Sequence, residues 1–204
     1  MQIDTYDNLK TALVDWSERA DIPSGQLEQF IFLAENDASQ QLRVPAMENK
    51  VELISSGGRL GIPFDFMELR RLTYTGGEVD TTLEYLPWDQ FVAISNNDST
   101  NTMYFSRQGA YWYLHASLAD GATVDCYYYR FIPALSDTVP TNWLLQVSPQ
   151  AYLYGSLKYL YEFVFQADRA AYWGDKLDKE LNKLQAIADL SEHRGSSLAV
   201  RQIP

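Results

Sequence analysis

One stretch of the chain, residues 124–165, constrains its fold more than any other. Residues 124–131 are dense in β-branched and aromatic side chains, which is typical of a half-buried strand. Pro133 ends this strand, because proline has no backbone N–H to donate to a sheet. Ser148 and Pro149 then indicate a helix start, with serine as the N-cap and proline in the first helical position. The stretch therefore predicts a strand, a crossing loop and a helix in that order.

The helix predicted after Pro149 is apolar on two faces. The first face is aliphatic and the second is mainly aromatic: Leu153, Leu157, Leu160 and Val164, against Tyr152, Ser156, Tyr159 and Phe163. A helix of this kind is usually packed on both sides. We expect the aliphatic face to lie in the core of the domain. The aromatic face either packs within its own subunit or meets a neighbouring subunit through Tyr152, Tyr159 and Phe163.

Helical periodicity also marks both ends of the chain. Apolar residues recur every three or four positions in residues 5–19, 26–42 and 168–192, which predicts amphipathic helices. In the first of these, Trp16 shares the apolar face. The break at Pro23 is short, and a short break between two helices favours an antiparallel hairpin. We expect these helices and the one after Pro149 to pack as a four-helix bundle.

The middle of the chain changes to the period of β-structure. Strands are predicted at residues 47–54, 69–74, 81–86, 102–107, 111–115 and 124–131. Residues 62–68 suggest a short helical turn opened by Pro63, and residues 87–92 suggest a short helix. The connections between strands are short, so most of the pairing is expected to be antiparallel.

These patterns predict an α+β fold, in which an α-helical bundle of about four helices, two N-terminal and two C-terminal, carries an inserted, mostly antiparallel β-region. We expect residues 1–45 and 146–192 to form the bundle. Residues 46–145 form the β-rich insert with its crossing loop. Residues 193–204 lose the helical period and are expected to be an extended C-terminal tail.

Composition narrows the classes of function. The net charge of −11 argues against a surface that grips duplex DNA, because phosphate binding needs clustered lysine and arginine. Fourteen tyrosines favour a protein that assembles, since tyrosine is enriched in interfaces. No apolar run approaches the eighteen residues of a membrane-spanning helix, so no membrane role is expected.

The residue types that carry catalysis or bind metals are scarce. His115, His193 and the single cysteine, Cys126, are too scattered for a zinc site, which needs about four ligands at local spacing. A G-x-S-x-G elbow is absent, so a hydrolase would need a dispersed triad around His115. Asp65 and Glu68 favour a cap and a solvated neighbour over an acid–base pair. The sequence predicts no catalytic residue, no cofactor and no metal site.

Aromatic residues gather in two of the predicted strands: Tyr111, Trp112, Tyr113, Tyr127, Tyr128 and Tyr129. Such residues can stack against sugars or bases. Strand alternation turns about half of them inward, and without interleaved basic residues a nucleic-acid platform is disfavoured. A carbohydrate-binding tail module that uses this aromatic β-region is the alternative function.

Several ordered motifs together resemble the head-to-tail adaptor (connector) proteins of short-tailed bacteriophages. The motifs include YDNLKTALVDWSERADIP, FIFLAENDASQQLRVPAME, GIPFDFMELRRLTY, YYYRFIPALSDTVPTNWLLQVSPQAYLYGSLKYLYEF and DRAAYWGDKLDKELNKL. The resemblance covers roughly residues 5–190. It implies a helical bundle with a β-rich elaboration, and a structural virion protein rather than an enzyme.

The resemblance further implies a ring, usually of twelve copies, beneath the portal protein at the capsid vertex. The next tail component, a nozzle or tail tube, would bind the distal side of the ring. DNA would pass through the lumen without sequence-specific binding. The protein would belong to the head–tail junction of the virion, after assembly in the host cytoplasm.

The C-terminal tail has two open interpretations. It is either a frayed terminus or a segment that orders on binding and lays alternate side chains along a partner. In related adaptors the C-terminal segment reaches into grooves of the portal. The resemblance therefore implies portal docking through Leu198, Val200, Arg201 and Ile203.

Overall fold

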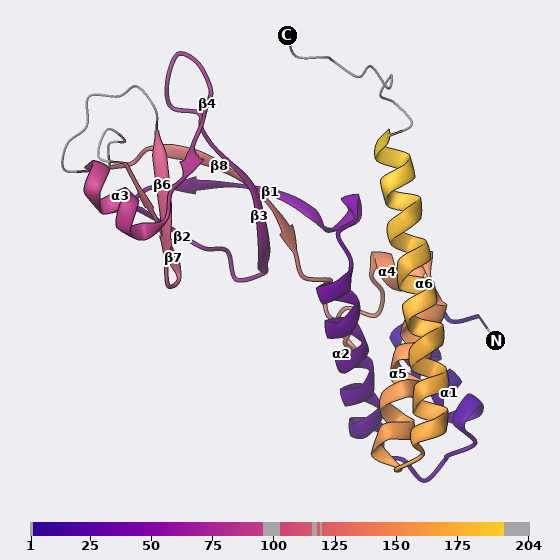
Figure 1. The fold of residues 1–204 in the computed structure, drawn as a ribbon. Coiled ribbons are helices and arrows are strands. Elements are labelled where there is room, and N and C mark those ends of the chain that lie inside the picture. The colour runs from indigo at the N-terminus through magenta and orange to yellow at the C-terminus, as the bar shows by residue number, and fades with distance from the viewer. Residues whose placement is uncertain (1, 96–102, 116–117, 119, 194–204) are drawn as a thin grey trace. The chain divides into compact units, whose positions relative to one another are not determined.

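The computed structural model describes residues 2–95, 103–115, 118 and 120–193 (Figure 1). The chain divides into two compact units. The helical unit comprises Met1–Met47 and Ile132–Pro204, and the β-unit comprises Glu48–Phe131. The described residues form six α-helices and two β-sheets, which confirms the predicted α+β class.

Five α-helices and one 3₁₀ turn make up the helical unit: α1 (Tyr6–Ser17), α2 (Ser24–Gln41), η1 (Pro45–Met47), α4 (Trp143–Val147), α5 (Pro149–Phe163) and α6 (Ala167–His193). The Thr5 hydroxyl caps α1 by accepting the N–H of Asn8 at 3.3 Å. Glu18 ends α1 in the left-handed conformation. Pro23, which precedes α2, separates the first two helices as the sequence predicts.

Helix α5 lies at the centre of this unit and packs against α1, α2, α4 and α6. Leu153, Leu157 and Leu160 are buried, as the aliphatic face predicts. Gly155 marks the closest approach to α2, because a Cβ atom built on it would lie 2.7 Å from the Cβ of Ala34. The absence of a side chain at Gly155 therefore lets the two helices meet.

The crossing segment before α5 contains a helix that the sequence did not reveal. Helix α4 is five residues long, too short for periodicity to show, and the Asn142 side chain caps it by accepting the N–H of Leu145 at 2.9 Å. Helix α5 begins at Pro149, as expected. Ser148 does not cap it, however, because its hydroxyl donates to Glu180 Oε1 at 2.8 Å instead.

The described part of the β-unit contains eight strands and one helix: β1 (Glu48–Ile54), β2 (Arg59–Gly61), β3 (Phe66–Tyr74), β4 (Thr81–Thr82), β5 (Glu84–Tyr85), α3 (Trp88–Ser95), β6 (Tyr104–Gln108), β7 (Tyr111–Leu114) and β8 (Thr123–Arg130). One sheet has the order β1-β8-β3-β4 and the other β2-β7-β6-β5. The described pairs are antiparallel except β5 with β6. The expectation of mostly antiparallel pairing is confirmed.

Two local predictions in the β-unit are wrong. Residues 62–68 do not form a helical turn throughout, because strand β3 already begins at Phe66. Residues 81–86 do not form one strand. The chain changes sheets at the buried Leu83, whose N–H donates to the carbonyl of Leu72, while the N–H of Glu84 donates to the carbonyl of Met103.

The β-unit has its own apolar core between the sheets, and Leu60, Leu72, Trp112, Val124 and Cys126 are at its centre. Burial raises the pKa of the Cys126 thiol to about 12, so the thiol stays protonated at neutral pH. Among the described helices, none is both long and apolar enough to cross a bilayer.

Candidate functional site

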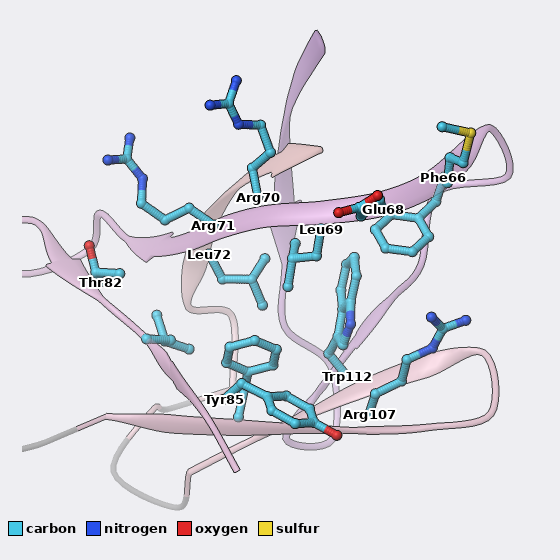
Figure 2. Close-up of a pocket in the computed structure, with 13 residues that line it drawn as sticks. Phe66, Glu68, Leu69, Arg70, Arg71, Leu72, Thr82, Tyr85, Arg107 and Trp112 are labelled. Atoms are coloured by element: carbon cyan, nitrogen blue, oxygen red, sulfur yellow. The ribbon is translucent and has the colours of Figure 1, made fainter. Parts of the chain in front are cut away.

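A cleft of about 550 Å³ opens between the two sheets of the β-unit (Figure 2). Every residue of β3 from 66 to 72 lines this β3 cleft. Successive side chains of a strand point to opposite faces, so a cavity lined by an unbroken run of residues follows the edge of the strand. The β3 cleft is therefore a groove along a strand edge.

The floor of the β3 cleft is apolar. Leu72, Leu83, Phe105 and Trp112 are buried and line it. The ring of Phe66 meets that of Trp112 edge to face, with 5.2 Å between centroids. Figure 2 shows the Leu72 side chain on the same side of β3 as Trp112, toward the interior of the cleft. The floor is thus part of the packed core and not a loose surface.

Arginines occupy the rims of the β3 cleft. The register of β3 against β8 shifts between Leu69 and Arg71, so β3 carries an extra residue, Arg70. In Figure 2 Arg70 and Arg71 both project from the side of β3 opposite to Leu72. The Arg71 guanidinium lies 4.5 Å from the ring centroid of Tyr127. The bulge therefore places two cations side by side on the outer face of the sheet.

The outer face of the sheet is not a simple cationic surface, however. Arg70 forms an ion pair with Glu48, and Lys50 forms one with Asp125 at 2.7 Å. These three cations therefore each have an acidic or aromatic neighbour, and both Arg71 and Lys50 lie over the ring of Tyr127. The two ion pairs offset much of the positive charge of this face.

The aromatic residues that could stack against sugars lie on both faces of their strands, because successive side chains of a strand alternate between the two faces. Trp112 and Tyr128 are buried in the core, whereas Tyr111 is exposed. The Tyr128 hydroxyl donates to Asp65 Oδ1 at 2.8 Å. Burial, and then this hydrogen bond, raises the pKa of Tyr128 to about 12. The aromatic residues therefore do not form one continuous stacking face, and Asp65 accepts a hydrogen bond from the core tyrosine.

The helical unit contains a buried carboxyl group, Glu35 of α2, that fastens the crossing segment. Its Oε1 accepts the Tyr152 hydroxyl at 2.7 Å and the Leu135 N–H at 2.8 Å. The Asn142 amide donates to the same tyrosine hydroxyl at 2.6 Å. Nearby, the Ser39 hydroxyl accepts the N–H of Ile132 at 3.2 Å. Burial raises the pKa of Glu35 to about 7, because a charge there has lost its hydration.

One of the three residues named for a subunit interface lies in the core of its own unit. Tyr152 is only 1% exposed and its hydroxyl is held by Glu35 and Asn142. A neighbouring subunit could not contact this side chain without opening the helical unit, so Tyr152 belongs to the core. The sequence could not show this, because its acidic partner lies 117 residues away along the chain.

The other two interface candidates reach the surface. Tyr159 is half-buried and donates its hydroxyl to Asp37 Oδ2 at 2.8 Å, where Lys158 also pairs with that oxygen at 2.8 Å. Phe163 is 50% exposed, and its ring lies 5.6 Å from that of Phe30. Tyr159 therefore ties α5 to α2, whereas Phe163 leaves half of its ring available.

Three exposed aromatic residues occur at helix ends of this unit, and sequence reasoning had not selected any of them as interface residues. Phe165, between α5 and α6, is 96% exposed and has a left-handed backbone with φ 58°. Trp16 and Tyr172 are each about half exposed and both pack on Trp173, with centroids 5.9 and 5.0 Å away. Its spacing in the sequence predicts that Trp16 lies on the apolar face of α1, but half of the side chain is exposed.

A bulky residue with positive φ is an uncommon and strained conformation. Phe165 therefore lies in a turn that holds an apolar ring in water at some cost in stability. No sequence signal marks a positive φ at phenylalanine. We call the four residues Trp16, Phe163, Phe165 and Tyr172 the aromatic end of the helical unit.

His115 and the C-terminal tail are the remaining candidates named from the sequence. His115 is buried beside Tyr104, with a ring distance of 6.2 Å. The part of the chain that the structure describes contains no group of three or more histidine, cysteine or acidic side chains that could hold a metal ion. The tail residues Leu198, Val200, Arg201 and Ile203 lie outside the described residues.

Comparison with known proteins identifies the family. No curated protein matches the chain. The family model described as SU10 adaptor protein matches residues 4–201, which includes both units. The match confirms the resemblance to phage head-to-tail adaptors, which are structural proteins of the virion. The chain belongs to the SU10 adaptor protein family.

Proposed function

We propose that this protein forms a ring beneath the portal at the capsid vertex and links the portal to the tail. The observation that carries the proposal is the family match over residues 4–201. The ring, with twelve copies as its expected number, receives the next tail component, a nozzle or tail tube, on its distal side. The protein assembles in the host cytoplasm and remains at the head–tail junction.

Ring closure needs two different surfaces of each subunit that complement one another. We assign one of these surfaces to the aromatic end of the helical unit. Exposed aromatic rings are enriched in protein interfaces, and Phe165 is the most exposed apolar residue among the described residues of the unit. Tyr159 is a neighbouring candidate for this surface, whereas Tyr152 is buried and is not part of it. The β-unit then faces outward or toward the tail.

The tail supplies the contact with the portal in this proposal. Leu198, Val200, Arg201 and Ile203 would lie along a portal groove and place apolar side chains in it. Removal of residues 195–204 should abolish binding to portal particles in a sedimentation assay. Unchanged binding of the truncated protein would contradict this part of the proposal.

The charge of the chain supports passage of DNA through the lumen. With a net charge of −11, a ring of this protein repels the phosphate backbone more than it attracts it. DNA should therefore slide without sequence-specific adhesion. A retarded band in a gel-shift assay with the free protein at physiological salt would contradict this.

A further inference from the structure

We propose that the β3 cleft is a docking site for an extended segment of another polypeptide, which pairs with the edge of β3 at residues 69–71. The segment would carry apolar residues at alternate positions and acidic residues at its ends. This inference goes beyond ring formation, although in the virion the segment would come from a neighbouring protein of the particle.

The strands that border the cleft are paired over only part of their length. Strand β4 is only two residues long, and it pairs with β3 at Thr73 and Tyr74. Strand β5 likewise pairs with β6 only at Tyr104 and Phe105. The chain leaves one sheet and joins the other at Leu83. The Leu72 carbonyl accepts the N–H of Leu83 at 2.9 Å, so among the described strands the open seam between the sheets runs along residues 69–71.

An apolar floor lies beside that seam. A strand that adds to an edge gains backbone hydrogen bonds, and it gains specificity when alternate side chains enter a pocket. The β3 cleft offers such a pocket, because Leu72, Phe105 and Trp112 lie directly below the edge. A segment of about six residues would span the ~20 Å of β3 that lines the cleft.

The rims of the cleft carry more positive than negative charge. Three arginines, Arg70, Arg71 and Arg107, and one acid, Glu68, line the cleft. Arg70 is paired with Glu48, so Arg71 and Arg107 carry the excess. This local excess of positive charge occurs in a chain whose net charge is −11. Complementarity therefore selects a segment with acidic ends. It disfavours the protein's own C-terminal tail, which carries Arg194 and Arg201 and no acidic residue.

A bulge and charged side chains also serve in many proteins to keep a strand edge from aggregating. The bulge at Arg70 fits that role for the outer face of the sheet. Protection from aggregation does not explain the apolar floor beside the edge. If protection were the whole role, the floor would be expected to be covered. The two features together suit a site that rejects other sheet edges and accepts a segment of the right charge.

The test uses the full chain and a fluorescein-labelled peptide, Glu-Asp-Val-Thr-Val-Ser-Leu-Thr-Ile-Asp-Glu, in an anisotropy titration. A second peptide has lysine in place of each acidic residue. A third has N-methyl groups on alternate apolar residues, which blocks pairing with an edge but keeps the side chains. We expect the acidic peptide to bind at least ten-fold more tightly than either of the others.

Two variants locate the binding. Leu69→Lys places a charge in the cleft and should weaken binding at least ten-fold. Ile54→Lys changes an exposed residue of β1, at the other edge of the same sheet, and should leave binding unchanged. Hydrogen exchange with the acidic peptide should slow in β3 and not in β1. Circular dichroism checks that both variants are folded.

Three results would overturn the inference. One is an absence of binding by the acidic peptide up to ~1 mM, a concentration that detects even weak complexes. Another is equal binding of the N-methylated peptide, which requires no variant and so does not depend on the folding of Leu69→Lys. The third is equal binding of the lysine peptide. The peptide assay uses free protein, so a negative result would not bear on ring formation on the portal. The portal-binding experiment can fail independently of the peptide assay.

Discussion

The hydroxyl of Tyr152 donates a 2.7 Å hydrogen bond to the buried carboxyl group of Glu35. This contact joins α5 to α2, and the Leu135 N–H completes it by donating to the same oxygen at 2.8 Å. The crossing segment is therefore held to the helical unit by a carboxyl group whose pKa is raised by burial to about 7. The stability of the unit should depend on pH for this reason.

Glu35→Gln should remove part of that pH dependence. In the unfolded chain the carboxyl has its ordinary pKa of 4.5, whereas in the folded chain it is about 7. Its protonated form therefore favours folding below pH 4.5, and this contribution is lost as pH rises to about 7. We expect the free energy of unfolding of the natural protein to fall relative to that of the variant by up to ~3 kcal/mol over this window.

Urea unfolding at pH 5.5, 6.5 and 7.5 measures this difference. Only the part of the window above pH 5.5 is sampled, so a drop of ~2 kcal/mol is expected. A constant difference between the two proteins across these pH values would show that Glu35 does not titrate there.

Tyr152→Phe should destabilise the helical unit by about 1–3 kcal/mol, because it leaves buried partners without their hydrogen bonds. Tyr159→Phe is the matched control on the same helix. Its hydroxyl also donates to a carboxylate, Asp37, but the residue is only half-buried and Lys158 remains paired with that carboxylate. We expect a loss of less than ~1 kcal/mol for the control. Equal losses in urea unfolding would contradict the assignment of Tyr152 to the core.

Gly155→Ala should lower the melting temperature although alanine favours helices. The added Cβ would lie 2.7 Å from the Cβ of Ala34, so α2 and α5 must move apart, at a cost of about 1–3 kcal/mol. Gly174→Ala is the control, because its nearest neighbour is the flexible Lys158 side chain at 3.8 Å. That change should stabilise the protein by up to ~1 kcal/mol. A stabilising effect at both positions would refute the close approach.

Phe165→Gly should raise the stability of the free protein and weaken its assembly on portal particles. Glycine adopts the φ of 58° without strain, so we expect the free protein to gain up to ~1 kcal/mol in unfolding free energy. The same change removes the most exposed side chain of the aromatic end, so we expect fewer copies of the protein to assemble on portal particles in a sedimentation assay. Leu190→Ser, on the exposed surface of α6, controls for the loss of any apolar side chain. If the two variants assemble equally well, Phe165 is not an interface residue.

Much of the helical unit could be predicted from the sequence because its periodicity is a local property. Leu153, Leu157 and Leu160 are buried where their spacing predicts. Tyr152 shows the limit of that reasoning. Its spacing placed it with Tyr159 and Phe163, but a distant carboxyl group decides that it lies in the core.

The β-unit shows the same limit in another form. Residues 81–86 read as one strand, yet the chain changes sheets because Leu83 packs between them. The β3 cleft is a consequence of that change of sheet, because β4 pairs with only one end of β3 and β5 pairs with only one end of β6. The exposed Phe165 likewise depends on a backbone conformation that phenylalanine rarely adopts. Neither surface has a signature in local sequence.

Electron microscopy of the protein mixed with purified portal particles tests the central claim most directly. If the protein is a head-to-tail adaptor, averaged side views should show an added ring of density beneath the portal, and top views should show its rotational symmetry. Portal particles that keep their original outline at saturating protein, in a preparation whose circular dichroism shows a folded chain, would contradict the claim.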